Sequence, residues 1–493
     1  MRIASVVAIA SGLAFESPSF AQQNQNSPFD GNYQFVEPDE SGVITHVLPD
    51  QNRDAIGLLP SDVSELPRNL WATSSTRTLK ALMAVQRDVL VPGALDLLYR
   101  VLLAEAAPPM DSDGSGELFL ARIDKLIEFG ALPPARELLN KGGVLDSQAF
   151  SRWFDISLLT NSEHQACRTL ERNRWLAPSQ AALVFCLVRI GKWKQAQSVL
   201  GEARAHGQLT ESEAMAMELL LEPEHAVKPD TANPRYNSAL EFRILLDSGF
   251  DVAEHPMPNA YAFLYQLSGP ELDVRLAKGE ELIQTRAIQF ERILMLQSEA
   301  HQSVTFDSES GGFDLVIGGE RELSSVKPEF VRDLTSLFDR ARDRQLEVYV
   351  ARYYAPQLAR AGIDPFADEE LKLLLLMAGP FPGHEVHYRG QTWQESVRSV
   401  IFDSELTDSM GDDPIVAAVR KGLEQPLGAG VLRELIRNDR IGEALLNITL
   451  RLQGYGVSNP ARINESLAAL REIGRSDIAL EIALQTLVRL RKI

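Results

Sequence analysis

The chain has 493 residues, of which 45% are hydrophobic and 24% are charged, and its 68 acidic residues outnumber its 49 Lys and Arg residues to give a formal net charge of −19. The hydrophobic content is ordinary for a globular protein and excludes disorder along the whole chain. The acidity argues against a nucleic-acid-binding protein, and two cysteines are too few for a zinc framework or a dense disulfide scaffold.

The N-terminus has the pattern of a secretory signal peptide. Arg2 supplies a positive charge, an apolar stretch runs to Phe15, and residues 19–21 (SFA) match a small-x-small cleavage site. We therefore predict a signal peptide over residues 1–21, a mature chain from Gln22 and a periplasmic location. A buried N-terminal helix is the alternative interpretation.

No later stretch reaches the roughly 20 apolar residues that a membrane-spanning helix needs, so we expect a protein that does not span the membrane. The most hydrophobic candidate, LKLLLLMAG at 371–379, is predicted to be a short buried helix. No cysteine follows the predicted cut, which argues against a lipid anchor.

The rest of the chain divides by composition. Residues 22–60 are rich in Gln, Asn, Asp, Gly and Pro and are predicted to be a flexible tether. Helical periodicity dominates afterwards, and we expect helical-repeat regions over 61–300 and 331–493. The insertion or linker between them, 301–330, includes two β-prone runs that predict a small hairpin near 303–318.

One local pattern recurs within the helical regions. A Leu is followed after four residues by a turn residue, and after five more by Ala. Such spacing fits a helical hairpin, because Gly accepts the left-handed conformation that ends the first helix and a small Ala lets the second helix approach closely. The four copies are Leu126–Gly130–Ala135, Leu187–Gly191–Ala196, Leu435–Asp439–Ala444 and Leu470–Gly474–Ala479.

Helical hairpins of this kind stack because none can bury its apolar face alone. The predicted fold class is therefore all-α, an α-solenoid of stacked helical hairpins. A compact pair of all-helical domains is the alternative.

The two cysteines, Cys167 and Cys186, flank a predicted helix–turn–helix whose turn runs from Asn173 to Pro178, with Ser179 as the cap of the second helix. The turn lies midway between the cysteines, so antiparallel helices place them at the same height. In an oxidising compartment this predicts a disulfide. Two buried free thiols are the alternative.

Two short motifs are candidate metal sites. The segment DSDGSGE at 111–117 resembles the start of a calcium loop, but Arg122 stands where a bidentate Glu is required, so a flexible acidic linker is the better interpretation. His384 and His387 form H-x-x-H in a Gly- and Pro-rich loop, without the helix that a zincin motif needs. We predict no metal and no cofactor.

Known catalytic motifs are missing from the sequence: it has no G-x-S-x-G elbow, Walker loop or dinucleotide-binding glycine pattern. The five tryptophans fit helix packing better than a carbohydrate platform, which remains an alternative. Trp175 and Trp193 fall at predicted hairpin turns, where half-burial of the aromatic ring is ordinary.

Parts of the chain resemble a family of secreted helical-repeat, tetratricopeptide-like proteins from alphaproteobacteria. The stretches that carry the resemblance are GLLPSDVSELPRNLWATSS (57–75), PGALDLLYRVLLAEAAPP (92–109), FLARIDKLIEFGALPPARELL (119–139) and ALVFCLVRIGKWKQA (182–196). It is clearest over residues 57–205. Members often carry the label "antifreeze glycopeptide", although the regular Thr-Ala-Ala repeats of such proteins are missing here. The resemblance implies export and a helical fold, and no particular reaction.

Together these features predict a periplasmic scaffold that binds protein or peptide partners in the cell envelope, with an acidic surface that favours basic partners. The alternative is an enzyme that acts on the cell wall, or a regulator of one. The sequence leaves the oligomeric state open.

Overall fold

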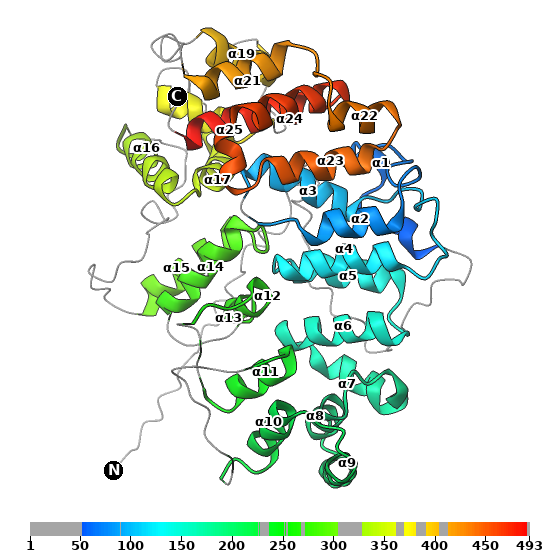
Figure 1. Ribbon diagram of the computed structural model, residues 1–493. Coiled ribbons are helices and arrows are strands. Elements are labelled where there is room, and N and C mark those ends of the chain that lie inside the picture. Colours follow the sequence, from blue (N-terminus) through cyan, green and yellow to red (C-terminus); the bar gives the residue numbers. More distant parts are fainter. Residues whose placement is uncertain are drawn as a thin grey trace, which may run out of the picture.

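The computed structural model describes residues 52–88, 90–224, 226, 236–250, 252, 255–267, 272–303, 328–360, 369–380, 391–403 and 413–490 (Figure 1). Helices dominate this part of the chain. They are α1 (Ser61–Ser64), α2 (Thr76–Ala84), α3 (Pro92–Leu103), α4 (Glu117–Glu128), α5 (Leu132–Gly142), α6 (Ser147–Leu159), α7 (Glu163–Arg172), α8 (Gln180–Arg189), α9 (Trp193–Ala205), α10 (Glu211–Leu221), α11 (Ala239–Asp247), α12 (Asn259–Ala262), α13 (Leu264–Leu267), α14 (Leu272–Gln284), α15 (Phe290–Ser303), α16 (Pro328–Asp343), α17 (Glu347–Arg360), α18 (Glu369–Met377), α19 (Trp393–Asp403), α21 (Pro414–Glu424), α22 (Val431–Arg437), α23 (Ile441–Arg451), α24 (Pro460–Glu472) and α25 (Ser476–Arg489).

The all-α prediction is confirmed. The described residues contain no β-strand, and a single parallel bridge between Leu59 and Ala104 is isolated. None of the described helices is both long and apolar enough to cross a membrane. The stretch at 371–379 forms most of α18, and all of its leucines except Leu373 are buried.

The repeated pattern marks helical hairpins at all four predicted places. The turn residue has a positive φ in each copy, for example 78° at Gly130 and 57° at Asp439. The carbonyl of the leading Leu accepts a hydrogen bond from the amide five residues later, as in Leu126 to Ala131 at 2.8 Å. This bond satisfies a carbonyl that the end of a helix would leave unpaired. The Ala of each copy is fully buried in the following helix.

The same turn also occurs where the sequence pattern is missing. Asn161, Arg286 and Gln345 have positive φ values of 54°, 57° and 60°, and the amide after each one donates to a carbonyl five residues earlier. With Asn161 included, three successive hairpin turns are regularly spaced, since Asn161 lies 31 residues after Gly130 and 30 before Gly191. The repeat is therefore more regular in structure than in sequence, because the backbone geometry tolerates several side chains.

The hairpins form an array that closes on itself (Figure 1). From α3, the chain descends through α4 to α9, returns through α10 to α19, and then adds α21 to α25. The last helices pack on the first: α23 contacts α2 and α3, and α25 contacts α3. The predicted regions 61–300 and 331–493 are thus joined through the N-terminal helices.

Helix α3 lies at the centre of this closure. Every residue of α3 except Arg100 is buried, which fits a segment that is hydrophobic on nearly all sides. The hydroxyl of Tyr99 donates to the carbonyl of Thr285 at 2.7 Å. The carboxylate of Asp96 pairs with Arg286 and, at 2.6 Å, with Arg352. These bonds tie α3 to α17 and to the turn after α14.

The N-terminal tether is shorter than its composition predicts. We expect a tether to residue 60, but Ile56 and Leu59 are buried and the amides of Leu58 and Leu59 both donate to the carbonyl of Leu103. Residues 52–60 therefore belong to the folded body, because nearby helices supply the partners that this segment lacks locally. The signal peptide and the hairpin near 303–318 lie outside the described residues, apart from Ser303 at the end of α15.

Candidate functional site

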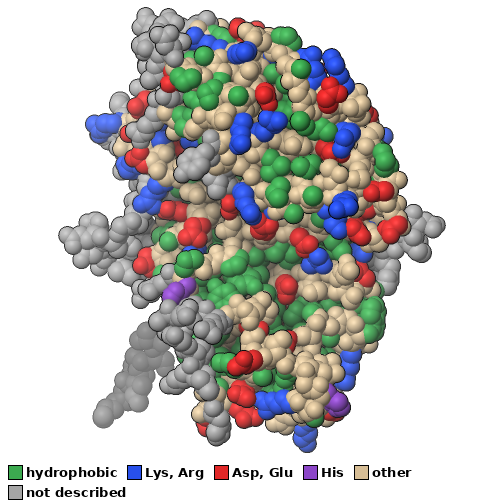
Figure 2. All heavy atoms as spheres, viewed as in Figure 1, with side chains coloured by type: hydrophobic (Ala, Val, Ile, Leu, Met, Phe, Trp, Pro, Cys, Tyr) green, Lys and Arg blue, Asp and Glu red, His purple; other side chains and the backbone are tan. Residues whose placement is uncertain are grey.

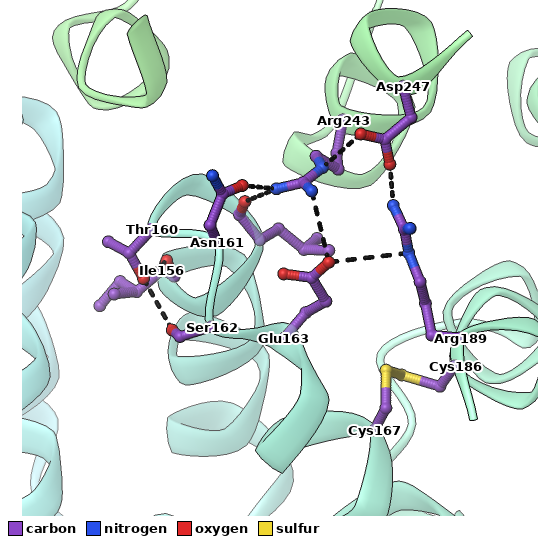
Figure 3. Close-up of polar contacts among 11 residues, drawn as sticks. Ile156, Thr160, Asn161, Ser162, Glu163, Cys167, Cys186, Arg189, Arg243 and Asp247 are labelled. Atoms are coloured by element: carbon purple, nitrogen blue, oxygen red, sulfur yellow. Dashed lines mark hydrogen bonds and ion pairs between the residues drawn. A yellow bond between two sulfur atoms is a disulfide. The ribbon is translucent and has the colours of Figure 1, made fainter. Parts of the chain in front are cut away.

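The cysteine pair lies in the hairpin of α7 and α8 (Figure 3). Helix α7 ends at Arg172, a 3₁₀ turn covers Arg174–Leu176, and Ser179 caps α8 by accepting a hydrogen bond from the amide of Ala182. The predicted turn and its cap are therefore confirmed.

The structure brings Cys167 and Cys186 to the distance of a disulfide. Their sulfur atoms lie 2.02 Å apart and their Cα atoms 4.6 Å apart. The two residues are 0% and 1% exposed. Thiol–disulfide exchange requires access of a thiolate to the sulfur, so this buried pair suits a stabilising role better than a redox-active one.

A ring of four charged side chains lies next to the cysteine pair (Figure 3). The carboxylate of Glu163 lies between the guanidinium groups of Arg189 at 3.6 Å and Arg243 at 3.4 Å. The carboxylate of Asp247 lies between the same two guanidinium groups, with Arg243 Nε at 2.9 Å. The ring connects α7, α8 and α11. Because every charge has two opposite neighbours, each one limits the cost of burying the others.

Arg243 also holds the turn between α6 and α7 in place. Its guanidinium donates to the carbonyl of Leu158 at 3.0 Å and to the side-chain oxygen of Asn161. Burial lowers the pKa of Arg243, while the neighbouring carboxylate of Glu163 raises it. Sequence reasoning missed this ring, since only the i, i+4 spacing of Arg243 and Asp247 gives a local signal.

Two exposed tryptophans flank α8 in this unit. Trp175 is 66% exposed in the 3₁₀ turn, and Trp193 is 51% exposed at the first residue of α9. Their neighbours touch: Arg174 donates to the side-chain oxygen of Gln195 at 3.4 Å. Trp193 is about half-buried, as expected at a hairpin turn, whereas Trp175 is more exposed than expected. Trp71, Trp153 and Trp393 are buried as expected.

We call Trp175 and Trp193, together with their exposed neighbours Arg172, Arg174 and Lys194, the Trp corner. The three charged residues of the Trp corner are all basic. A nearby lysine, Lys192, is paired with Glu171. The Trp corner thus combines large exposed aromatic area with positive charge, although the whole chain is acidic.

On the face shown in Figure 2, acidic and basic side chains are interspersed, and hydrophobic side chains gather in a hollow near its middle.

Side-chain hydrogen bonds hold the segment 111–117 against the folded body, whereas we expected a flexible linker. Asp111 accepts hydrogen bonds from the amide and the hydroxyl of Thr76 at 2.7 and 2.8 Å, and these bonds lower its pKa. The hydroxyl of Ser112 donates to Asp54 at 2.6 Å. The loop therefore holds the start of α2 against the N-terminal segment.

Arg122, which replaces the calcium-binding Glu, has a structural role. Its side chain is fully buried, and its guanidinium donates to the carbonyls of Ile56, Leu102 and Ala104 at 2.6–2.8 Å. Burial lowers the pKa of Arg122 to about 10, with the opposite influence of Asp54 second. It therefore remains charged at neutral pH and fastens the N-terminal segment to the end of α3.

One carboxyl group has a pKa suited to proton transfer. Burial raises the pKa of Asp155 on α6 to about 7, and Arg152 only partly offsets it. Asp155 in turn contributes to the raised pKa of Tyr261, about 12, for which burial is the main cause. Tyr261 stacks on Phe242 with ring centroids 4.7 Å apart, and Tyr236 packs on both.

The two histidines considered as metal ligands, His384 and His387, lie outside the described residues. Within the described ranges, no group of three or more His, Cys, Asp or Glu side chains could hold a metal ion.

The chain matches no protein-family model, no curated protein and no solved structure.

Proposed function

We propose that this protein is an exported, periplasmic helical-repeat scaffold that binds protein or peptide partners in the cell envelope. The observation that carries the proposal is the exposure of Trp175 and Trp193, which precede and follow α8, next to the cysteine pair and the charge ring that brace the α7–α8 hairpin. Tryptophan is enriched among the residues that dominate binding energy. Large exposed apolar area on a soluble protein marks interaction sites.

Export is supported by the signal-peptide pattern of residues 1–21 and by a cysteine pair at disulfide distance, which suits an oxidising compartment. The resemblance of residues 57–205 to secreted alphaproteobacterial helical-repeat proteins agrees with the same location.

The charge of the Trp corner gives the partner a chemistry. Arg172, Arg174 and Lys194 are exposed beside the two tryptophans, so the partner segment that contacts this corner carries carboxylates as well as apolar side chains. The net charge of −19 by itself favours basic partners for the protein as a whole. At the Trp corner the local positive charge outweighs it and favours an acidic partner segment.

The test is enrichment of partners from cross-linked periplasm with three forms of the mature protein. These are wild type, Trp175→Ser/Trp193→Ser, and a control, Met110→Ser/Val431→Ser, which removes two other exposed apolar side chains, 70% and 58% exposed. We expect the same partner with wild type and control, and its loss with the tryptophan variant. A partner set that is empty, or that the tryptophan variant leaves unchanged, would contradict the proposal.

A second candidate function is an enzyme that acts on the cell wall, or a regulator of one. The observation in its favour is Asp155, whose pKa of about 7 beside Tyr261 suits general acid–base catalysis near neutral pH. Purified peptidoglycan digested with wild type and with Asp155→Asn separates the two candidates. Release of muropeptides by wild type alone would support catalysis, and unchanged muropeptides would remove direct catalysis.

A further inference from the structure

The closure of the array creates a groove on the surface, which we call the seam groove. It lies where the segment around α1 meets the hairpins α22–α23 and α24–α25, and its volume is about 540 Å³. Ligand pockets in proteins range from about 300 to 1,000 Å³, so the seam groove has room for one or two amino-acid residues. Its lining consists of Ser61, Glu65, Leu66, Pro67, Arg68, Ile441, Ile473 and Arg475.

The floor of the seam groove is apolar. Leu66 and Pro67 come from the N-terminal side, whereas Ile441 and Ile473 come from the two C-terminal hairpins. The N-terminal pair lies 374 to 407 positions before the C-terminal pair in sequence, so the floor exists only in the closed array. An apolar floor recognises an apolar side chain through the area it removes from water.

The two arginines of the seam groove differ in their partners. Arg475 is occupied, because it donates to both the carboxylate and the carbonyl of Glu65 and to Asp477. Arg68 is exposed, and its Nε donates to the hydroxyl of Ser61 at 3.1 Å. No carboxylate among the described residues forms an ion pair with Arg68. One guanidinium at the edge of the groove is thus available for an anion.

The wall beside Arg68 is held in an unusual conformation. Glu65 has a φ of 55°, which costs energy for a residue other than glycine. Its carboxylate is held by Arg475 at 2.6 Å and by Arg100 at 3.2 Å. The N- and C-terminal parts of the chain therefore together fix the backbone that presents Leu66, Pro67 and Arg68 to the groove.

We propose that the seam groove binds the C-terminal residue of a partner polypeptide, with its apolar side chain on the floor and its carboxylate on Arg68. A C-terminal residue carries both groups on one Cα atom, and capture of a C-terminal carboxylate is a recurring mode of peptide recognition. The proposal rests on the partner-binding function above and names the chemistry of one recognised group.

The test uses small probes and needs no identified partner. Binding of N-acetyl-L-phenylalanine, of its carboxamide and of acetate to the mature protein is measured by calorimetry and by NMR. We expect saturable binding of the free acid, at least ten-fold weaker binding of the carboxamide, and no measurable binding of acetate. Equal binding of acid and carboxamide, or no saturable binding of the acid, would overturn the proposal.

Variants locate the binding. Arg68→Gln should remove the preference for the acid, whereas Arg68→Lys should retain it in part, and the control Arg437→Gln, at an exposed arginine outside the groove, should leave it unchanged. Ile473→Glu, which places a carboxylate on the floor, should weaken the acid at least ten-fold. A preference that survives both Arg68→Gln and Ile473→Glu would place the probe elsewhere and reject the seam groove. These variants leave the Trp corner unchanged. The outcome of the partner-enrichment experiment is therefore independent of the outcome of the probe-binding experiment.

Discussion

The guanidinium of Arg475, in the last helical hairpin, donates hydrogen bonds to the carboxylate and to the carbonyl of Glu65, 410 residues earlier. The side chain of Arg475 is 8% exposed and that of Glu65 is 58% exposed. This contact joins the two ends of the described chain beside the close approach of Gly442 to Leu70 and Trp71, where an added Cβ would lie 2.5 Å from the Leu70 carbonyl.

Removing Arg475 should destabilise the protein more than removing Glu65. Arg475→Ala deletes charged hydrogen bonds at a largely buried position, worth on the order of 2–3 kcal/mol. Glu65→Ala deletes an exposed carboxylate, for which the loss is below about 1 kcal/mol. Urea denaturation of both single variants and of the double variant gives the values. Equal losses in the two single variants would contradict this ranking.

Loss of the cysteine pair should lower the free energy of unfolding by roughly 3 kcal/mol, the value for a disulfide that closes a loop of about 20 residues. We expect the peptides of Cys167 and Cys186 to be linked in mass spectra of the non-reduced, exported protein. Reductant should destabilise wild type and leave Cys167→Ala/Cys186→Ala unaffected. Free thiols at both positions in the exported protein would leave only a packing role.

Asp155 should make stability depend on pH. Burial raises its pKa to about 7 in the folded state, above an unfolded value near 4. The folded state therefore binds the proton more tightly, and stability declines as pH rises from about 4 through 7. Asp155→Asn should remove this decline and exceed wild type at pH 8 by on the order of 2 kcal/mol. Denaturation at pH 5 and pH 8 checks the sign, and an equal pH dependence in both proteins would contradict it.

The glycines of the hairpin turns should differ in their tolerance of alanine. Gly191 has a φ of 77° and open space where a methyl group would lie, whereas a Cβ at Gly130 would lie 2.9 Å from the carbonyl oxygen of Asn259. Gly191→Ala should cost about 1 kcal/mol from backbone strain alone. Gly130→Ala should cost at least about 1 kcal/mol more from the close contact. Thermal and urea denaturation distinguish the two, and indistinguishable losses would mean that the neighbours of Gly130 yield freely.

Local features were predictable because their causes are local. A residue that accepts a left-handed conformation ends a helix whatever lies far away, so the turns at Gly130, Gly191, Asp439 and Gly474 could be located from spacing. The cysteine pair could be placed in the same way, since its turn lies midway between the two residues. The turns at Arg286 and Gln345 escaped prediction because these side chains give no sign of a positive φ. The turn at Asn161, a residue type that accepts this conformation, escaped because Ser157 stands where the pattern requires Leu.

The sequence by itself determined the helical class, the hairpin units and the position of the cysteine pair, all of which depend on neighbours within about 20 residues. Tertiary structure alone decided that the array closes, that Arg122 binds three backbone carbonyls, and that Trp175 and Trp193 face outward. The seam groove belongs to the second group, because its floor and its arginines come from opposite ends of the chain. Such contacts arise from packing between distant helices, and no local pattern records which distant helix will arrive.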